Sequence, residues 1–167
     1  MQEDEYLDIV NENDVVIGKD LRSNIYAKNL SNNIRVINIF LFNSKNELLL
    51  PKRSANRKIF PNCYDFSCGE HVTLGEEYYD AAIRGLEEEL GIKNVKLIEL
   101  GKLTPKDGAN CFMKVYKLVY DFPIVNYDKD GIESLNWFSL EKVKQLLKEN
   151  KTDFKSDFPI AFEKYFS

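Results

Sequence analysis

An acidic segment carries the residue types and spacing best suited to chemistry. Residues 69–92 read GEHVTLGEEYYDAAIRGLEEELGI. Positions three and four apart are neighbours on a helix, so Arg84 and Gly85 share one face with Glu88 and Glu89. A carboxylate beside the apolar stripe of such a helix is partly desolvated, which is unfavourable unless it is paired or bound to a metal. The pattern predicts that Glu88 and Glu89 converge on one cation.

A basic loop precedes this segment. Between Pro51 and Pro61 the chain carries Arg53, Arg57 and Lys58, which are side chains of the kind that neutralise phosphate oxygens. Mg²⁺ is held by a few carboxylates together with phosphate oxygens of a substrate. The two segments together predict a metal-bridged diphosphate site, with the three basic residues as candidate substrate contacts. Without a ligand, both segments also fit a solvated charged surface.

The composition narrows the classes of protein that this chain can represent. It has 167 residues, of which 44% are hydrophobic and 30% charged, and this is typical of one globular domain. A net charge of −4 provides no overall basic excess for binding a nucleic acid polymer. Three cysteines and an acidic N-terminus favour a cytoplasmic protein without a secretion signal. The most apolar stretch, 36–42, is too short to cross a bilayer, so we expect no membrane partner.

The acidic segment must be positioned by a helix, which is the clearest element in the sequence. A helix over 75–90 is predicted by apolar residues at helical spacing, namely Tyr79, Ala82, Ile83, Leu86 and Leu90. Gly91 follows at the position where a left-handed C-terminal cap belongs.

The remaining segments read mainly as strands. Dense β-branched and aromatic residues predict a strand over 35–42, with a partner strand over 47–50. A hairpin is predicted within residues 1–30. Further strands are predicted at 64–68, 95–103, 112–120 and 135–138, and helices at 140–148 and 159–165. This order indicates an α+β or mixed α/β fold rather than alternating βαβ units.

The acidic segment resembles the Nudix box. That pattern is Gly, five residues, Glu, seven residues, Arg-Glu, an apolar residue, any residue, Glu-Glu, any residue, Gly and an apolar residue. Anchored on Arg84, the match includes Glu76, Leu86, Glu88, Glu89, Gly91 and Ile92. Two positions depart from the pattern. Glu70 stands at the opening glycine, and Gly85 stands where a glutamate follows the arginine.

Segments outside the box extend the resemblance. YLDIVNENDVVIGKDLR, RVINIFLFNSKNELLLPKRS and KIFPNCYDFS are similar to the Nudix subfamily related to type I isopentenyl-diphosphate isomerases. The resemblance implies a single Nudix domain over 1–167 with an N-terminal hairpin extension over 1–30. It implies an α/β/α sandwich with a mixed sheet. It also implies hydrolysis of a small-molecule diphosphate, such as a nucleoside diphosphate derivative, with Mg²⁺ or Mn²⁺.

The resemblance also assigns roles within the box. Glu88 and Glu89 become the metal ligands, and Arg84 orients carboxylates. Glu76 is either a further ligand and partner of Arg84 or an acid that favours the start of the helix. His71 falls where the related isomerases keep a metal-binding histidine, and it is either a ligand or a structural residue.

Gly85 leaves a question about catalysis open. Many family members have a third ligand or a general base at this position, and a glycine within a helix is less stable than alanine by about 0.5–1 kcal/mol. Two alternatives follow. Either another residue, Glu133 or Glu70, acts as the general base, or the protein is a weak or altered catalyst.

Two alternatives to a hydrolase follow from the sequence. One is an isopentenyl-diphosphate isomerase, although the strand over 35–42 lacks the histidines of those enzymes and Cys68 is one residue away from their cysteine position. The other is a nucleotide-binding module without turnover. The oligomeric state stays open, with a homodimer among the alternatives.

Overall fold

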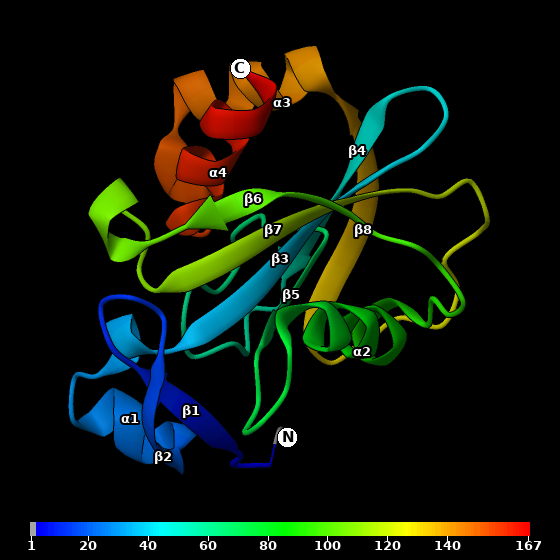
Figure 1. The fold of residues 1–167 in the computed structure, drawn as a ribbon. Coiled ribbons are helices and arrows are strands. Elements are labelled where there is room, and N and C mark those ends of the chain that lie inside the picture. Colours follow the sequence, from blue (N-terminus) through cyan, green and yellow to red (C-terminus); the bar gives the residue numbers. More distant parts are fainter. Residues whose placement is uncertain (1–2) are drawn as a thin grey trace.

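A mixed sheet lies between two helical layers (Figure 1). The computed structural model describes residues 3–167. The strand order is β6-β7-β3-β4-β8, and β5 pairs with β3 beside this path. The strands are β3 (Arg35–Phe42), β4 (Glu47–Arg53), β5 (Cys68–His71), β6 (Ile98–Leu103), β7 (Phe112–Val119) and β8 (Ile132–Ser139).

Strand β3 determines where β5 lies. β7 runs parallel to β3 along its whole length. The first half of β3 pairs antiparallel with β5, from Val36 opposite His71 to Ile39 opposite Cys68. β4 leaves β3 after the turn and pairs with β8. Among the described strands β5 therefore has β3 as its one partner, and its other edge can bind side chains.

The alternating side chains of β3 divide the core between two faces. Ile37, Ile39 and Leu41 pack with α2 (Tyr78–Leu90). Phe40 and Phe42 pack on the other face, against α3 (Leu140–Glu149) and α4 (Asp157–Phe166). Figure 1 shows α2 on one side of the sheet and α3 and α4 on the other. The expected α+β fold with a mixed sheet between helices is confirmed.

An N-terminal hairpin packs against the sheet near the end of β5, where Leu7 forms a bridge with Thr73. It consists of β1 (Tyr6–Val10) and β2 (Val16–Leu21), and α1 (Arg22–Ala27) follows it. Asp14 in the hairpin turn binds Arg35 of β3 at 2.6 Å and accepts a hydrogen bond from Tyr78 of α2 at 2.7 Å. These contacts hold the hairpin against the sheet.

The strand at the start of the box differs from the sequence-based prediction. We predicted a strand over 64–68, whereas β5 spans Cys68–His71 and Tyr64 forms only isolated bridges. The sequence Cys-Gly-Glu-His has weak strand propensity, so its pairing is imposed by the apolar strand β3. The predicted loop 51–61 also begins later, because β4 continues to Arg53.

The helix of the box is shorter than predicted and its buried face is different. α2 begins at Tyr78, because Gly75 adopts a left-handed φ of 73° in a turn. Tyr79 was assigned to the apolar face, but it is 40% exposed, whereas Gly85 is buried. Gly91 has the predicted left-handed conformation, with φ 66°. Short 3₁₀ turns at 31–33, 105–107 and 151–153 complete the structure. Within residues 3–167, no helix has the length and apolar character needed to cross a membrane.

Candidate active site

Arg84 joins the acidic residues of the box. Its Nε and Nη2 atoms donate to the two carboxylate oxygens of Glu76, at 2.9 and 3.0 Å. Its Nη1 donates to Glu88 at 3.2 Å, and its Nη2 also donates to the backbone oxygen of His71 at 2.8 Å. One guanidinium therefore fixes α2 to the turn before it and to strand β5.

Glu76 is a partner of this arginine in the structure. Thr73 donates to Glu76 from both its backbone nitrogen and its hydroxyl group. Burial raises the pKa of Glu76, but the hydrogen bonds from Arg84 and Thr73 outweigh burial and lower it overall. Its role as a metal ligand stays a prediction, because both oxygens are occupied by hydrogen bonds here.

Two carboxylates accept hydrogen bonds from backbone amides of β5 that are two residues apart. Both amides lie on the edge of β5 that faces away from β3. The backbone nitrogen of Gly69 donates to Glu89 at 3.4 Å, and that of His71 donates to Glu70 at 3.0 Å. Burial, with the nearby charges of Glu70 and Asp65, raises the pKa of Glu89 to about 8. Burial likewise raises the pKa of Glu70 to about 7, although the charge of Arg84 opposes this shift.

The three adjacent glutamates of α2 lie in different environments, as the helical spacing predicts. Glu89 points inward to β5, and Glu88 is exposed and bound to Arg84. Glu87 is exposed and pairs with Lys93 at 3.1 Å. Glu88 and Glu89 thus lie on the side of α2 that meets β5, while Glu87 belongs to the solvated surface.

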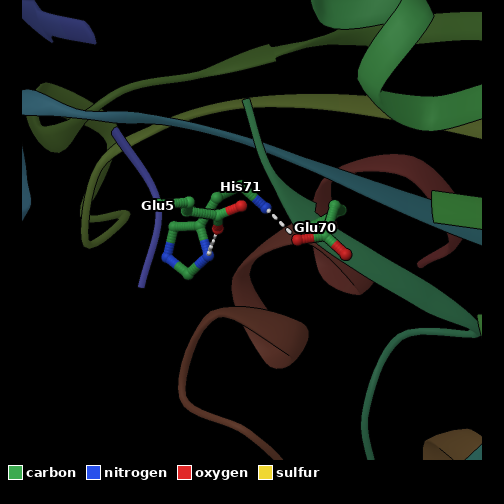
Figure 2. A group of neighbouring side chains, drawn as sticks. All are labelled: Glu5, Glu70 and His71. Atoms are coloured by element: carbon green, nitrogen blue, oxygen red, sulfur yellow. Dashed lines mark hydrogen bonds and ion pairs between the residues drawn. The ribbon is translucent and has the colours of Figure 1, made fainter. Parts of the chain in front are cut away.

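His71 lies in a second group that the sequence did not reveal. Figure 2 shows the carboxylate of Glu5 facing its imidazole, with Glu70 beside it on β5. One ligand atom from each of Glu5, Glu70 and His71 lies within 4.8 Å of the others. The hydroxyl of Tyr26 is 3.0 Å from Nε2 of His71. Burial, assisted by the charge of Arg22, lowers the pKa of His71 to about 3, so the ring is neutral.

The donor set suits a hard divalent cation. Glu70, Glu88 and Glu89 offer carboxylate oxygens near one edge of the sheet, and such oxygens are the ligands that Mg²⁺ and Mn²⁺ prefer. A buried carboxylate without a cation is unfavourable, which fits the raised pKa of Glu89. The acidic residues present therefore fit the metal that the resemblance implies.

The basic loop is placed differently from the expectation. Arg53 donates to Asp65 at 2.9 Å and to the backbone oxygens of Ile59 and Phe60, so in this structure it orders its own loop. Arg57 donates to the backbone oxygen of Gly131. Lys58 is exposed. A direct substrate contact stays a prediction for each of Arg53, Arg57 and Lys58.

Glu133 lies on β8, whereas the other acidic residues of the site lie on α2 and β5. It is exposed on β8, at the irregularity where Lys52 and Arg53 of β4 shift register. Glu133 as a general base therefore stays a prediction.

An open pocket of about 380 Å³ lies at the turn between β3 and β4. Its lining includes Asn43, Lys45, Asp121, Phe122 and Trp137. Phe122 is 71% exposed and Trp137 is 37% exposed. The residues of this pocket come from a turn, a loop and β8, so no local sequence pattern links them.

Comparison with known proteins gives a consistent result. The family description NUDIX domain matches residues 32–158. An uncharacterized Nudix hydrolase of Nostoc sp. is 46% identical over 153 residues, which is 89% of each chain. A crystal structure of a Deinococcus radiodurans protein superimposes with a TM-score of 0.89 at 30% identity, covering 98% of this chain and all of that one.

An isomerase also resembles the chain over most of its length. The chloroplastic isopentenyl-diphosphate Delta-isomerase II of Arabidopsis thaliana is 34% identical over 174 residues. The match covers 89% of this chain and 60% of the isomerase. The similarity to hydrolases is therefore stronger than the similarity to isomerases, as the resemblance of the box predicts.

Proposed function

This chain belongs to the Nudix family, and we propose that it hydrolyses a phosphoanhydride bond in a nucleoside diphosphate derivative or a similar small organic pyrophosphate. The family match and the hydrolase relatives make it a hydrolase that acts on pyrophosphate bonds. The proposal adds the substrate class and a requirement for Mg²⁺ or Mn²⁺. It is supported above all by Arg84, which links Glu76, Glu88 and the backbone of β5. We call the edge of β5 near which Glu70, Glu88 and Glu89 lie the acidic edge.

Glu88 and Glu89 would hold the metal ion in this proposal. When bound, a divalent cation polarises phosphate oxygens and lowers the pKa of a water molecule that attacks phosphorus. Glu89 is kept in place by the amide of Gly69, and Glu88 by Arg84. Arg84 is thus a positioning residue, because its donors bind carboxylates and a backbone oxygen.

Basic residues would neutralise the phosphate oxygens that the metal leaves free. Lys58 is exposed, and Arg57 is one-third exposed and is bound weakly to Asp128 at 3.8 Å. Both side chains can turn to a ligand without breaking a short ion pair. Arg53 contributes by holding the loop from which Lys58 extends.

We propose that the pocket at the β3–β4 turn receives the nucleoside part of such a substrate. Exposed aromatic side chains stack on nucleobases, and Phe122 and Trp137 offer such surfaces. Asn43 and Asp121 of the same lining hold the turn in place, because Asn43 bonds Lys45 and Glu47 and Asp121 accepts from the backbone nitrogen of Ser44. These features favour a nucleoside over a purely aliphatic leaving group.

A substrate screen tests the proposal. Nucleoside diphosphates and triphosphates, sugar nucleotides, dinucleotides and isoprenoid diphosphates are incubated with Mg²⁺ or Mn²⁺, and phosphate release and product masses are measured. We expect metal-dependent hydrolysis of at least one compound that contains a nucleoside, and loss of this hydrolysis with a chelator. Binding of such compounds without turnover at saturating metal would instead indicate a binding module.

The isomerase remains the second candidate because of its sequence similarity. Cys68 is 1% exposed, and its side chain faces Gly85 of α2. Burial and the adjacent Glu89 raise the pKa of its thiol well above the usual value. A buried, neutral thiol is poorly placed for proton exchange with a substrate. Exchange of deuterium into isopentenyl diphosphate would favour the isomerase.

We also propose a cytoplasmic location. Cys63, Cys68 and Cys111 are all free thiols. Thiols persist in this form in reducing compartments. Labelling of the three cysteines in protein taken directly from cells would test this, and a disulfide-linked form would contradict it.

A further inference from the structure

The packing of Gly85 explains why this helix lacks a side chain at that position. A Cβ atom at Gly85 would lie 3.1 Å from Cβ and 3.6 Å from Cγ of Glu70, and 3.3 Å from Sγ of Cys68. The contacts with Cβ of Glu70 and Sγ of Cys68 are tighter than ordinary packing, so these neighbours would have to shift slightly. Glu70 of β5 therefore fills the space toward which a side chain at position 85 of α2 would point.

Glu70 brings its carboxylate to the same place. The side chain is 3% exposed, so it lies almost entirely beneath the surface. One of its oxygens accepts the amide of His71, and the other lies 3.8 Å from Nη1 of Arg84. The same Nη1 atom binds Glu88 at 3.2 Å. Glu70 and Glu88 thus share one guanidinium nitrogen.

Glu89 approaches the same strand edge. Gly69 and His71 point their amides to the same side of β5, and these amides bind Glu89 and Glu70 respectively. Glu70 is thus linked to Glu88 through Arg84, and to Glu89 through two amides on the same edge of one strand.

We propose that Glu70 is the third acidic ligand of the metal site, in place of a residue at position 85. The inference rests on the proposed function, because it adds a ligand to the ion held by Glu88 and Glu89. The glutamate and the glycine of the box have exchanged positions between β5 and α2. Glycine on α2 accommodates a side chain at position 70 of β5, because a Cβ atom at position 85 would lie only 3.1 Å from the Cβ atom of Glu70.

The exchange also accounts for the unfavourable glycine. A glycine within a helix lowers its stability, and it is usually retained for a packing reason. Here the reason is the stem of Glu70, which lies against the helix. Gly85 is therefore a consequence of the relocated carboxylate rather than the mark of a lost one.

A different cation position has to be distinguished from this one. Glu70 also belongs to the group with Glu5 and His71, whose ligand atoms lie within 4.8 Å of one another (Figure 2). Arg84 lies 3.8 Å from Glu70 and binds Glu88 at 3.2 Å, whereas its hydrogen bond to His71 goes to the backbone oxygen. We therefore assign Glu70 to the ion at Glu88 and Glu89.

Binding of Mn²⁺, measured by calorimetry and by electron paramagnetic resonance in the absence of substrate, tests the assignment. We expect Glu70→Gln and Glu89→Gln each to weaken Mn²⁺ binding by at least about tenfold, since even outer partners of a metal site contribute that much. Glu87→Gln, on the same helix but bound to Lys93, is the matched control and should bind as the wild type does. Glu5→Gln should change the affinity by less than about threefold.

Restoring the usual order of the box provides a second test. Gly85→Glu alone should lower the melting temperature, because its Cβ meets Glu70, and it should not strengthen Mn²⁺ binding. Glu70→Gly alone should lose affinity. The double variant Glu70→Gly with Gly85→Glu should regain affinity to within about threefold of the wild type, which is the non-additivity expected of coupled positions.

The outcomes separate this inference from the proposed function. Wild-type Mn²⁺ affinity in Glu70→Gln, with loss in Glu89→Gln, would overturn the role of Glu70 and leave the hydrolase proposal intact. Wild-type affinity in both variants would contradict the metal site of the proposed function itself. Equal loss in Glu5→Gln and Glu70→Gln, with no loss in Glu89→Gln, would place the ion at His71 and also overturn the inference. If the double variant does not fold, the isosteric Glu70→Gln decides.

Discussion

Arg84 and Glu76 form a two-pronged ion pair, with Nε to Oε2 at 2.9 Å and Nη2 to Oε1 at 3.0 Å. The pair joins α2 to the turn that precedes it. Because both Glu76 oxygens are engaged, the remaining nitrogen of Arg84, Nη1, is directed to Glu88 and Glu70. The geometry of the acidic edge therefore depends on a planar guanidinium at position 84.

Replacing this arginine by lysine should damage both stability and turnover. An ammonium group cannot reproduce two parallel hydrogen bonds to Glu76 and still reach Glu88. We expect Arg84→Lys to lower the free energy of unfolding by about 1–3 kcal/mol and kcat by at least about tenfold. Urea denaturation and metal-saturated kinetics measure these effects.

The exposed pair Lys93–Glu87 provides the control for this variant. Lys93→Gln removes an ion pair of similar length from the surface, and we expect a change in the free energy of unfolding below about 1 kcal/mol. An Arg84→Lys variant that resembles Lys93→Gln in both measurements would show that Arg84 does not position the site.

The loop before the box should respond differently to changes at Arg53 and Lys58. Arg53→Lys removes hydrogen bonds to Asp65 and to two backbone oxygens, so it should lower stability by about 1–3 kcal/mol and speed proteolysis of the loop. Lys58→Gln should leave stability within about 0.5 kcal/mol of the wild type and raise KM. A higher KM in Arg53→Lys with unchanged stability would instead show that Arg53 contacts the substrate.

Strands whose side chains are buried on both faces of the sheet could be predicted from the sequence. β3 has the predicted bounds, 35–42, because a dense run of β-branched and aromatic residues has few other solutions. β5 could not be predicted, since its residues have weak strand propensity and pair only because β3 presents an open edge. The start of α2 was placed too early, because Gly75 adopts a left-handed conformation in the turn before the helix.

The site could be predicted only where its residues share one helix. Helical spacing placed Arg84 and Glu88 on one face, and the structure pairs them at 3.2 Å, whereas Glu89 binds the amide of Gly69. Glu5 and Tyr26 lie far from His71 in sequence, and no periodicity connects them. The meaning of Gly85 also depended on the structure, because the sequence shows a missing carboxylate but not the side chain that fills its space.

Asp14 should make the stability of the protein depend on pH in the acid range. Burial raises the pKa of Asp14, but hydrogen bonds from Lys102, Arg35 and Tyr78 outweigh burial and lower it below the usual 3.8. A carboxyl group whose pKa is lower in the folded state binds fewer protons there than in the unfolded state. It therefore stabilises the fold above about pH 4, and this contribution is lost as the pH falls through the folded-state pKa.

The variant Asp14→Asn checks this expectation. Asparagine tolerates the left-handed φ of 59° at this position, so the turn should survive. We expect the variant to be less stable than the wild type by about 1–3 kcal/mol at pH 7, with a difference that shrinks below pH 4. A difference that stays constant from pH 7 to pH 2 would contradict an ionic contribution from Asp14.

Trp137 should contribute to binding of substrates that contain a base. Removing its ring from the pocket should weaken binding of a nucleoside diphosphate by about 1–3 kcal/mol, the range for stacking on one base. Trp137→Ala should leave the KM for a diphosphate without a base unchanged. Equal losses for both kinds of substrate, or none for either, would place the nucleoside elsewhere.

In the proposed function, Glu88 and Glu89 make this protein a metal-dependent hydrolase of phosphoanhydrides. The most direct measurement compares kcat of the wild type, Glu89→Gln and Glu87→Gln at saturating Mg²⁺ on the best nucleoside diphosphate derivative. Because glutamine keeps the size of the side chain but removes its charge, we predict a fall of at least about a hundredfold in Glu89→Gln. Glu87→Gln should match the wild type, since Glu87 pairs with Lys93 on the surface. Unchanged turnover in a folded Glu89→Gln protein would contradict the account.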